Sequence, residues 1–348
     1  MRIFSYRNKR TLRRIALIAL LAAVLLGLLI LARISYLGRY VVYSQDGVYF
    51  DKTQKLQRTP QTVPDTSNAE EYPFETILSA ASEETDVDPN AVQLQGFYIS
   101  TTMLANGVDE VRQALADADG YNAVLIDVKS PLGNFYYSTD IADTQTADAD
   151  IDACDALIKE LTETPDLIVI ARVPTFSDPN FVAKHYSSAL TTKSGDLWMD
   201  ERRCYWLRPD SLDARSYLAA IALELDARGF DEVLFDNFTV PDDSSIAWDT
   251  EAITQIAALE DCAETLGANL TGSSIRLALG TTVPSVAQYA SRVYITTEKA
   301  NDVMTMTEAM GEVLPDPATQ LVFVTTSHDT RFDAAGVIRP LMGDDSGD

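Results

Sequence analysis

The sequence predicts an α/β protein whose strands close into a (β/α)8 barrel of the TIM type, preceded by one N-terminal transmembrane helix. Its 348 residues accommodate such a barrel, which needs about 250, together with an attachment segment. From Gln95 onward, short apolar runs alternate with helical patterns, as is typical of parallel strands covered on both faces. Near the N-terminus stands a long apolar run without a charge, which indicates a membrane span.

Composition narrows the range of functions. Apolar residues make up 46% and charged residues 23%, which is ordinary for a globular protein. Against 27 Lys and Arg stand 52 Asp and Glu, giving a net charge of −25, so the surface repels nucleic acid and we expect no nucleic-acid partner. Three Cys and two His lie scattered, so we expect no metal site and no cofactor.

The N-terminal residues predict a single-pass anchor. Residues 1–14 carry six Lys and Arg, and residues 15–32 contain no charge. A helix of that length spans about 27 Å, close to the hydrocarbon thickness of a bilayer. Basic residues favour the cytoplasmic side, so we expect a cytoplasmic N-terminus, a cell-membrane location and an extracellular C-terminal domain. The alternative is a cleaved signal peptide, although the run exceeds a usual h-region and no small-x-small site follows it.

Residues 33–94 read as an extracytoplasmic stalk or linker. Within it, residues 40–50 predict a short hairpin with Asp46 and Gly47 in the turn. Residues 51–90 are rich in Thr, Pro, Asn, Asp and Glu with little periodicity, which is typical of a linker. The barrel domain then covers residues 95–342, and an acidic tail follows at 343–348.

Seven apolar, β-branched runs predict strands of the barrel: 96–100, 123–129, 167–173, 232–238, 275–280, 292–297 and 321–326. The eighth strand is either degenerate within 336–342 or absent. In the second case the barrel is incomplete. A doubly wound open sheet is the alternative architecture, but no Gly-x-Gly-x-x-Gly follows a strand.

Helices are predicted between the strands. The clearest covers residues 211–228, where Leu218, Ile221, Ala222 and Leu225 recur at helical spacing and Gly229 stands at the position of a C′ glycine. Residues 108–118 and 151–161 show the same pattern more weakly.

Polar residues that end the strands are the candidate site, because in α/β barrels the carboxyl ends of strands meet at one mouth. Asp236, Glu298 and Asp127 are the candidate catalytic residues, since cleavage of a glycosidic bond uses two carboxyl groups, one to protonate the leaving oxygen and one to attack or to activate water. We expect Asp236 and Glu298 to form the pair and Asp127 to position them.

Further polar and aromatic residues are candidates for substrate binding. Tyr136, Tyr137 and Tyr205 are possible platforms for sugar rings, together with two tryptophans. The full set of substrate-binding candidates is Lys129, Arg172, Trp198, Asp200, Trp206, Asn237 and Asp329.

Structural roles are open alternatives for several of these. Asp127 and Lys129 share a strand face at i, i+2 and could form an ion pair with each other. Arg172 could form a salt bridge to Asp127 or Asp236 instead of contacting substrate. Phe238 and Tyr98 are expected in the core.

Four segments, in this order, resemble a known family. They are GFYIS, YNAVLIDVKSPLGNFYYSTDI, LIVIARVPTFSDP and the stretch from GDLWMDERRCYWLRPD to FDNFTVP, together covering about residues 95–241. The chain here is similar to bacterial putative glycosyl hydrolase domains, which are exported or membrane-anchored TIM-barrel proteins related in fold to α-amylase-like glycoside hydrolases. The resemblance implies that family positions are occupied by Asp127, Lys129, Arg172, Trp198, Asp200, Trp206 and Asp236.

Together these observations predict a membrane-anchored, extracytoplasmic glycoside hydrolase acting on a polysaccharide or cell-wall glycan by carboxylate acid/base chemistry. The alternative is a catalytically inactive carbohydrate- or cell-wall-binding barrel. The expected partners are the glycan and, through residues 15–32, the lipid bilayer. A third class, a tethered assembly factor, would present an exposed apolar patch instead of a polar cleft.

Overall fold

The computed structural model describes residues 41–44, 47–50, 92–249 and 253–342. The chain divides into two units, residues 1–82 and 83–348. In the first, β1 (Val41–Ser44) pairs antiparallel with β2 (Gly47–Phe50), as the hairpin prediction requires, although Gly47 begins the second strand instead of completing the turn.

Three predicted segments, 15–32, 51–90 and 343–348, lie outside the described residues. Within the described part of the chain, no helix combines the length and the apolar character needed to cross a membrane.

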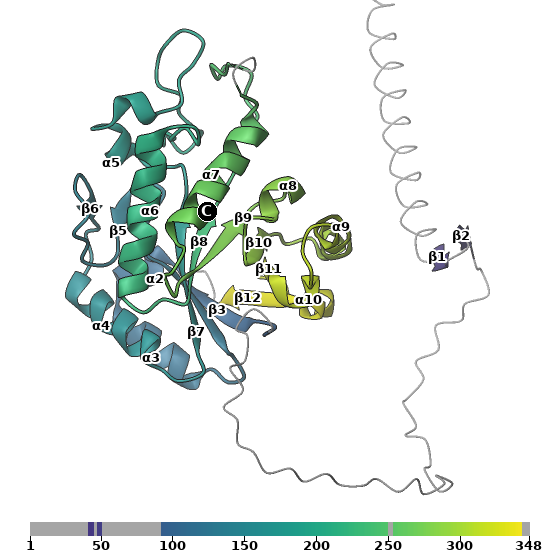
Figure 1. The fold of residues 1–348 in the computed structure, drawn as a ribbon. Coiled ribbons are helices and arrows are strands. Elements are labelled where there is room, and N and C mark those ends of the chain that lie inside the picture. Colours follow the sequence, from purple (N-terminus) through teal and green to yellow (C-terminus); the bar gives the residue numbers. More distant parts are fainter. Residues whose placement is uncertain (1–40, 45–46, 51–91, 250–252, 343–348) are drawn as a thin grey trace, which may run out of the picture. The chain divides into compact units, whose positions relative to one another are not determined.

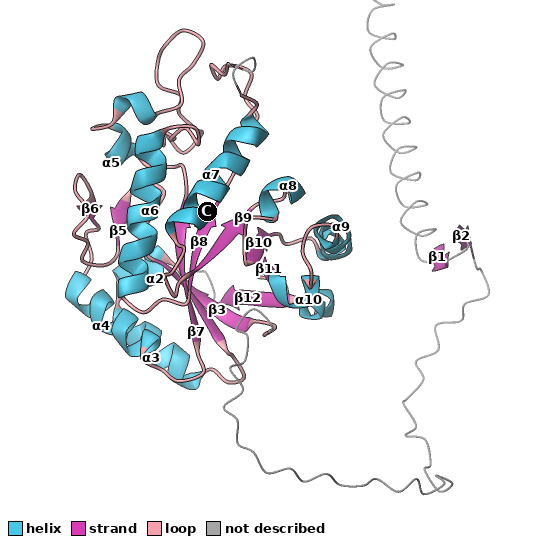
Figure 2. Ribbon diagram, in the orientation of Figure 1, coloured by secondary structure: helices cyan, strands magenta, loops and turns pink. Residues whose placement is uncertain are grey.

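The second unit is a closed barrel of eight parallel strands (Figures 1 and 2). Around the ring, each strand pairs with the next barrel strand in the chain, and the last pairs with the first. The strands are β3 (Gln95–Ile99), β4 (Ala123–Asp127), β7 (Ile168–Pro174), β8 (Glu232–Asp236), β9 (Arg276–Gly280), β10 (Arg292–Thr296), β11 (Leu321–Val324) and β12 (Gly336–Pro340).

All seven predicted strands are confirmed, and of the two alternatives for the eighth, a degenerate strand within 336–342 is confirmed and the absence of an eighth strand is wrong. The eighth strand, β12, pairs with β11 on one side and with β3 on the other, so the ring closes. Its sequence, GVIRP, is interrupted by Arg339 and ends in a proline, so it lacks the continuous apolar pattern that identifies the others.

Helices lie outside the ring of strands (Figure 2). The predicted helix at 211–228 is α6, whose N-cap Ser211 accepts a hydrogen bond from the Ala214 amide and whose end is followed by Gly229 at φ 86°. The helical segments are α2 (Thr101–Asn106), α3 (Val108–Asp117), α4 (Ile151–Thr162), α5 (Pro179–Val182), α6 (Leu212–Ala227), α7 (Gln255–Asn269), α8 (Pro284–Ala287), α9 (Ala300–Gly311), α10 (Pro317–Gln320) and the 3-10 turns η3 (Tyr186–Ser188) and η4 (Thr330–Ala334). A small two-stranded sheet of β5 (Asn134–Phe135) and β6 (Gln145–Thr146) lies between β4 and α4.

Two apolar layers form around the strands because successive side chains of a strand point to opposite faces. One layer packs between strands and helices and includes Val124, Val233 and the apolar faces of α3, α4, α6 and α7. The other fills the barrel interior, with members Leu94, Ala123, Leu125, Ile170, Leu234, Ala278, Tyr294, Val322, Val324 and Ile338.

A buried ionic cluster occupies the amino-terminal end of the barrel. Glu232 begins β8, and its carboxylate contacts the guanidinium groups of Arg292 and, at 2.9 Å, Arg276. It also accepts a hydrogen bond of 2.9 Å from the Tyr294 hydroxyl. The side chains of Glu232 and Arg292 are fully buried, and Arg292 donates to the Val92 carbonyl at 2.9 Å, which ties the entry of the chain to the barrel.

We expect Glu232→Gln to lower the free energy of unfolding by about 3–5 kcal/mol, because it leaves a buried guanidinium without its counter-charge. Urea unfolding followed by tryptophan fluorescence measures the loss. The matched control is Glu160→Gln, which breaks the exposed pair with Arg112 and should cost no more than about 1 kcal/mol. Equal losses in the two variants would contradict this assignment.

Candidate functional site

Three charged side chains from neighbouring strands meet at the carboxyl end of the barrel. Asp127 ends β4, Asp236 ends β8, and Arg172 lies on β7 between them, paired in register with Asp127. Each stands two residues beyond an inward-facing apolar side chain, so each points into the mouth of the barrel. Those apolar residues are Leu125, Ile170 and Leu234.

Arg172 joins the two carboxylates. Its Nε lies 2.6 Å from Oδ1 of Asp127 and 3.9 Å from Oδ2 of Asp236, while its Nη2 donates to Oδ2 of Asp127 at 2.9 Å. The guanidinium also lies 5.7 Å from the ring centre of Tyr98. Arg172 thus forms the salt bridges that its position suggested, and both acids lie at one site.

Asp127 is the more enclosed of the two acids, with its side chain 10% exposed against 23% for Asp236. Burial raises the pKa of Asp127 above its ordinary value. The positive charge and hydrogen bond of Arg172 oppose that rise, and the negative charge of Asp236 adds to it. Asp127 is therefore held by Arg172 in a place where a free carboxylate would be costly.

The backbone around Asp236 is fixed from two sides. Its carbonyl accepts hydrogen bonds from the amide and the hydroxyl of Thr175, at 3.0 and 2.6 Å. Gly280 ends the neighbouring strand, and a Cβ at that position would lie 2.5 Å from Oδ1 of Asp236, so only glycine leaves room for the carboxylate. Asn237 follows in the left-handed region at φ 51°, with an exposed side chain.

Glu298 lies in the loop after β10, with β9 between its strand and that of Asp236. Its carboxylate accepts hydrogen bonds from the amide of Thr326 at 3.0 Å and from the hydroxyls of Thr326 and Thr325 at 2.6 and 3.2 Å. Partial burial acts to raise its pKa, but these hydrogen bonds outweigh burial and hold the pKa below the ordinary value. Glu298 therefore remains ionised over a wider range of acidic pH than a free glutamate.

Asp329 belongs to a local turn. Its Oδ2 lies 2.6 Å from Nη2 of Arg331, and its Oδ1 accepts from the Arg331 amide at 3.0 Å, as the N-cap of η4. The side-chain and backbone hydrogen bonds from Arg331 lower the pKa of Asp329 to about 2. No contact in the described structure joins Asp329 to Asp127 or Asp236.

A cavity of about 300 Å³ lies next to the end of β8, where it is lined by Asn237, the residue that follows Asp236. It combines the ends of β7 and β8 with a hairpin at 199–205, in which Met199 pairs with Tyr205. Asp200 stabilises this hairpin by accepting from the Cys204 amide at 2.8 Å and from Nε1 of Trp206 at 2.9 Å. The lining residues are Pro131, Pro174, Thr175, Ser177, Asp200, Glu201, Arg202, Trp206 and Asn237.

Four of the seven expected binding residues do not line this cavity: Lys129, Arg172, Trp198 and Asp329. Lys129 is fully buried and pairs with Asp178 at 3.0 Å instead of with Asp127, because β4 ends at Asp127 and the chain turns into a bridge with Phe135. Trp198 is 7% exposed and Tyr137 is fully buried, so neither offers a ring face to a sugar. Phe238 is fully buried, as expected.

Sequence reasoning missed Glu201 and Arg202 as residues of the cavity wall and Gly280 as the residue that makes room for Asp236. The first two directly follow the candidate Asp200. Extending that candidate to the adjacent charged residues would have included them. Gly280 carries no comparable signal, since only the pairing of β8 with β9 shows what it faces.

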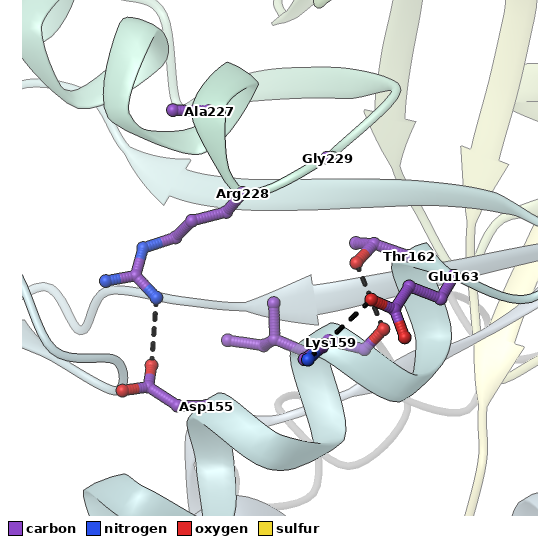
Figure 3. Close-up of a pocket in the computed structure, with 8 residues that line it drawn as sticks. Asp155, Lys159, Thr162, Glu163, Ala227, Arg228 and Gly229 are labelled. Carbon is purple, nitrogen blue, oxygen red and sulfur yellow. Dashed lines mark hydrogen bonds and ion pairs between the residues drawn. The ribbon is translucent and has the colours of Figure 1, made fainter.

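A second cavity, of about 510 Å³, lies elsewhere (Figure 3). Its walls are α4 and the end of α6, and the residues from α6 immediately precede β8, so it lies toward the amino ends of the strands. Arg228 is paired with Asp155 at 3.1 Å and Lys159 lies 3.9 Å from Glu163, so these charges are already compensated. None of the candidate site residues lines it. Across the described ranges, His, Cys, Asp and Glu form no group of three or more that could hold a metal ion.

Barrels of this type carry their active sites at the carboxyl ends of the strands, which is where Asp127, Arg172 and Asp236 lie. Residues 96–310 match the family described as "Putative glycosyl hydrolase domain", which is more than half of the chain, and the chain belongs to that family. No curated protein matches the sequence.

Solved structures resemble the chain at low identity. A hypothetical protein from Ruminiclostridium thermocellum ATCC 27405 is 24% identical, with 52% of this chain and 96% of that chain covered and a TM-score of 0.45. The α-galactosidase from Lactobacillus brevis is 10% identical, with 72% and 38% covered and a TM-score of 0.48. The glycoside hydrolase domain of PelA from Pseudomonas aeruginosa is 12% identical, with 72% and 95% covered and a TM-score of 0.43.

We expect Arg172→Met to lower the free energy of unfolding by about 3 kcal/mol at neutral pH, because it leaves the buried Asp127 carboxylate without its partner. The loss should shrink as the pH falls, since the variant raises the pKa of Asp127 further and the neutral acid tolerates burial. Unfolding measured between pH 4 and 8 tests the sign.

The control is the double variant Asp127→Asn, Arg172→Met, which has no carboxyl group to titrate at this position. Its stability relative to wild type should change less with pH than that of Arg172→Met. A loss in Arg172→Met that grows as the pH falls would refute the assignment.

Proposed function

We propose that this chain hydrolyses glycosidic bonds of a polysaccharide or cell-wall glycan at the mouth of its barrel. The observation that carries the proposal is the row of Asp127, Arg172 and Asp236 beside a cavity that contains Trp206. A tryptophan offers an apolar face for a sugar ring, and carboxyl groups are the reactive groups that glycosidic cleavage requires. Membership in the putative glycosyl hydrolase family supports the same chemistry.

Asp236 and Glu298 are the proposed catalytic pair. The hydrogen bonds from Thr325 and Thr326 favour the ionised form of Glu298, which suits the carboxylate that attacks the sugar or activates water. Asp236 then protonates the leaving oxygen. If the two groups cooperate across the width of β9, a water molecule between them would give inversion of configuration.

Asp127 has a positioning role in this proposal. Both of its oxygens lie close to Arg172, and Arg172 in turn reaches Asp236. Because both distances are measured to the same Nε atom, the two carboxylate oxygens are separated by no more than the sum of 2.6 and 3.9 Å. Arg172 thereby links the orientation of Asp236 to a buried anchor on β4.

A carbohydrate-binding barrel without turnover is the second candidate. The observation that favours it is that the Glu298 carboxylate accepts hydrogen bonds from Thr326, just after the end of β11. If that carboxylate stays there when a glycan binds, Asp236 has no partner acid and the cavity beside it serves binding alone.

Asp236→Asn should lower the rate of glycan hydrolysis by about 10²–10⁴-fold and retain binding, because the amide keeps the shape of the side chain but cannot transfer a proton. Product release from a panel of cell-wall polysaccharides measures turnover, and affinity electrophoresis in the same glycans measures binding. Glu298→Gln should show the same loss of turnover. The turnover of Asp236→Asn should recover on substrates whose leaving group is acidic, because such a group departs without being protonated.

The matched control is Glu308→Gln, an exposed acid on α9 that lines neither the cavity nor the mouth, which should leave both turnover and binding unchanged. Binding by the wild type without any turnover supports the non-catalytic barrel. Full turnover in Asp236→Asn would eliminate the proposed pair.

We also propose that residues 15–32 anchor the chain in the cell membrane and that the barrel is extracellular. The support is the uncharged run itself, the six basic residues before it, and the absence of Asp and Glu from residues 1–45. The proposal adds a lipid bilayer as a partner and a location next to a cell-wall glycan.

Fractionation of cells that produce the full chain tests this placement. We expect the protein to sediment with membranes, to resist extraction by carbonate and high salt, and to lose its barrel to protease added outside intact spheroplasts. Removal of residues 15–32 should transfer the protein to the soluble fraction, because it deletes the uncharged apolar run that is proposed to span the bilayer. Protection of the barrel from external protease would contradict the orientation.

A further inference from the structure

The two sides of the barrel mouth differ in the length of the loops that follow the strands. Residues 128–150 connect β4 to α4, residues 175–211 connect β7 to α6, and residues 237–254 connect β8 to α7. On the opposite side, residues 281–283, 297–299 and 325–329 connect β9, β10 and β11 to the next helical segment. Figure 1 shows the connections after β7 and β8 extending beyond the ends of α6 and α7.

The loops after β7 and β8 are joined to each other and form a wall. The Lys193 amide donates to the Ser245 carbonyl at 2.8 Å, and the Ala247 amide donates to the Thr191 carbonyl at 2.8 Å. An antiparallel bridge between Thr192 and Ile246 lies between these bonds. Loops cross-linked in this way hold a fixed shape, because their backbone groups are paired with each other instead of with water.

Side chains reinforce the same wall. The buried Trp198 donates from Nε1 to Oδ2 of Asp243 at 2.8 Å, and its ring packs edge-on against Trp206 at 5.9 Å. The guanidinium of Arg208 lies 5.0 Å from the ring centre of Trp248. Trp198, which the sequence suggested as a sugar platform, therefore supports Trp206 from behind and fixes one side of the cavity beside Asp236.

The opposite rim is low. Thr282, Lys299 and His328 follow the ends of β9, β10 and β11, and all three are exposed. Asp236 and the cavity thus have the wall of the long loops on one side and the low rim on the other.

We propose that the site binds an internal stretch of a long glycan chain, which lies against the wall and passes over the low rim, so that cleavage is of the endo type. The inference rests on the proposed function. A site for a chain end needs walls on all sides of the terminal sugar, whereas one wall and one low rim leave room for sugars beyond the bond that is cleaved. The wall holds the sugar in the cavity, and the exposed rim residues contact the sugars that follow.

Binding to oligosaccharides of graded length tests the inference. The probes are the monomer to the hexamer of chitin, cellulose, amylose and polygalacturonate, titrated calorimetrically into the full chain in detergent. For the series that binds, we expect the dissociation constant to fall at least about tenfold, or 1.4 kcal/mol, from monomer to hexamer.

Thr282→Trp and His328→Trp place bulk on the low rim and should weaken hexamer binding several-fold while leaving monomer binding unchanged. Ala116→Trp, on the exposed face of α3, adds the same bulk away from the mouth and is the matched control. Circular dichroism confirms that each variant folds.

Three results would overturn the inference. A monomer that binds as tightly as the hexamer shows a chain-end pocket and leaves the proposed function standing. If binding depends on oligosaccharide length but neither rim variant weakens hexamer binding, the glycan does not cross the rim. Failure of every series to bind removes the proposed function and this inference together.

Discussion

Closure of eight parallel strands into one ring is the constraint on which the rest of the structure depends. In a closed ring, every second side chain of every strand must face the interior, so the inward positions near the carboxyl ends of neighbouring strands converge on one mouth. Asp127, Arg172 and Asp236 occupy three such positions on adjacent strands. An open sheet with the same strand sequences would not require its two ends to meet, and a slip of one residue in β7 would turn Arg172 away from both acids.

The two ends of this ring use charge in different ways. At the amino end, Glu232 is shared between two arginines with its side chain fully sealed from solvent, which serves stability. At the carboxyl end, Arg172 is shared between the buried Asp127 and the more exposed Asp236, so the site stays open to a ligand on the side of Asp236. Both ends of the barrel pair opposite charges. The exposure of the carboxylates distinguishes the candidate catalytic cluster from the structural one.

The long loops after β7 and β8 give the mouth its asymmetry. They consist of backbone-paired, aromatic-supported segments, whereas the loops after β9 to β11 are short turns into the next helix. In an α/β barrel the strands and helices set the frame, and such loops determine which ligand fits. Trp198 was a candidate for substrate binding, yet its side chain is buried and packs edge-on against Trp206.

The sequence by itself determined seven of the eight strands, the helix α6 with its cap, and the identity of the acids at the strand ends. These features depend on local periodicity and on capping chemistry, which are visible within a few consecutive residues. Only the tertiary structure decided that β12 closes the ring, that Lys129 pairs with Asp178 instead of Asp127, and that Gly280 makes room for Asp236. Each of those depends on contacts between segments far apart in the chain, and no local pattern specifies which distant side chain a residue will meet.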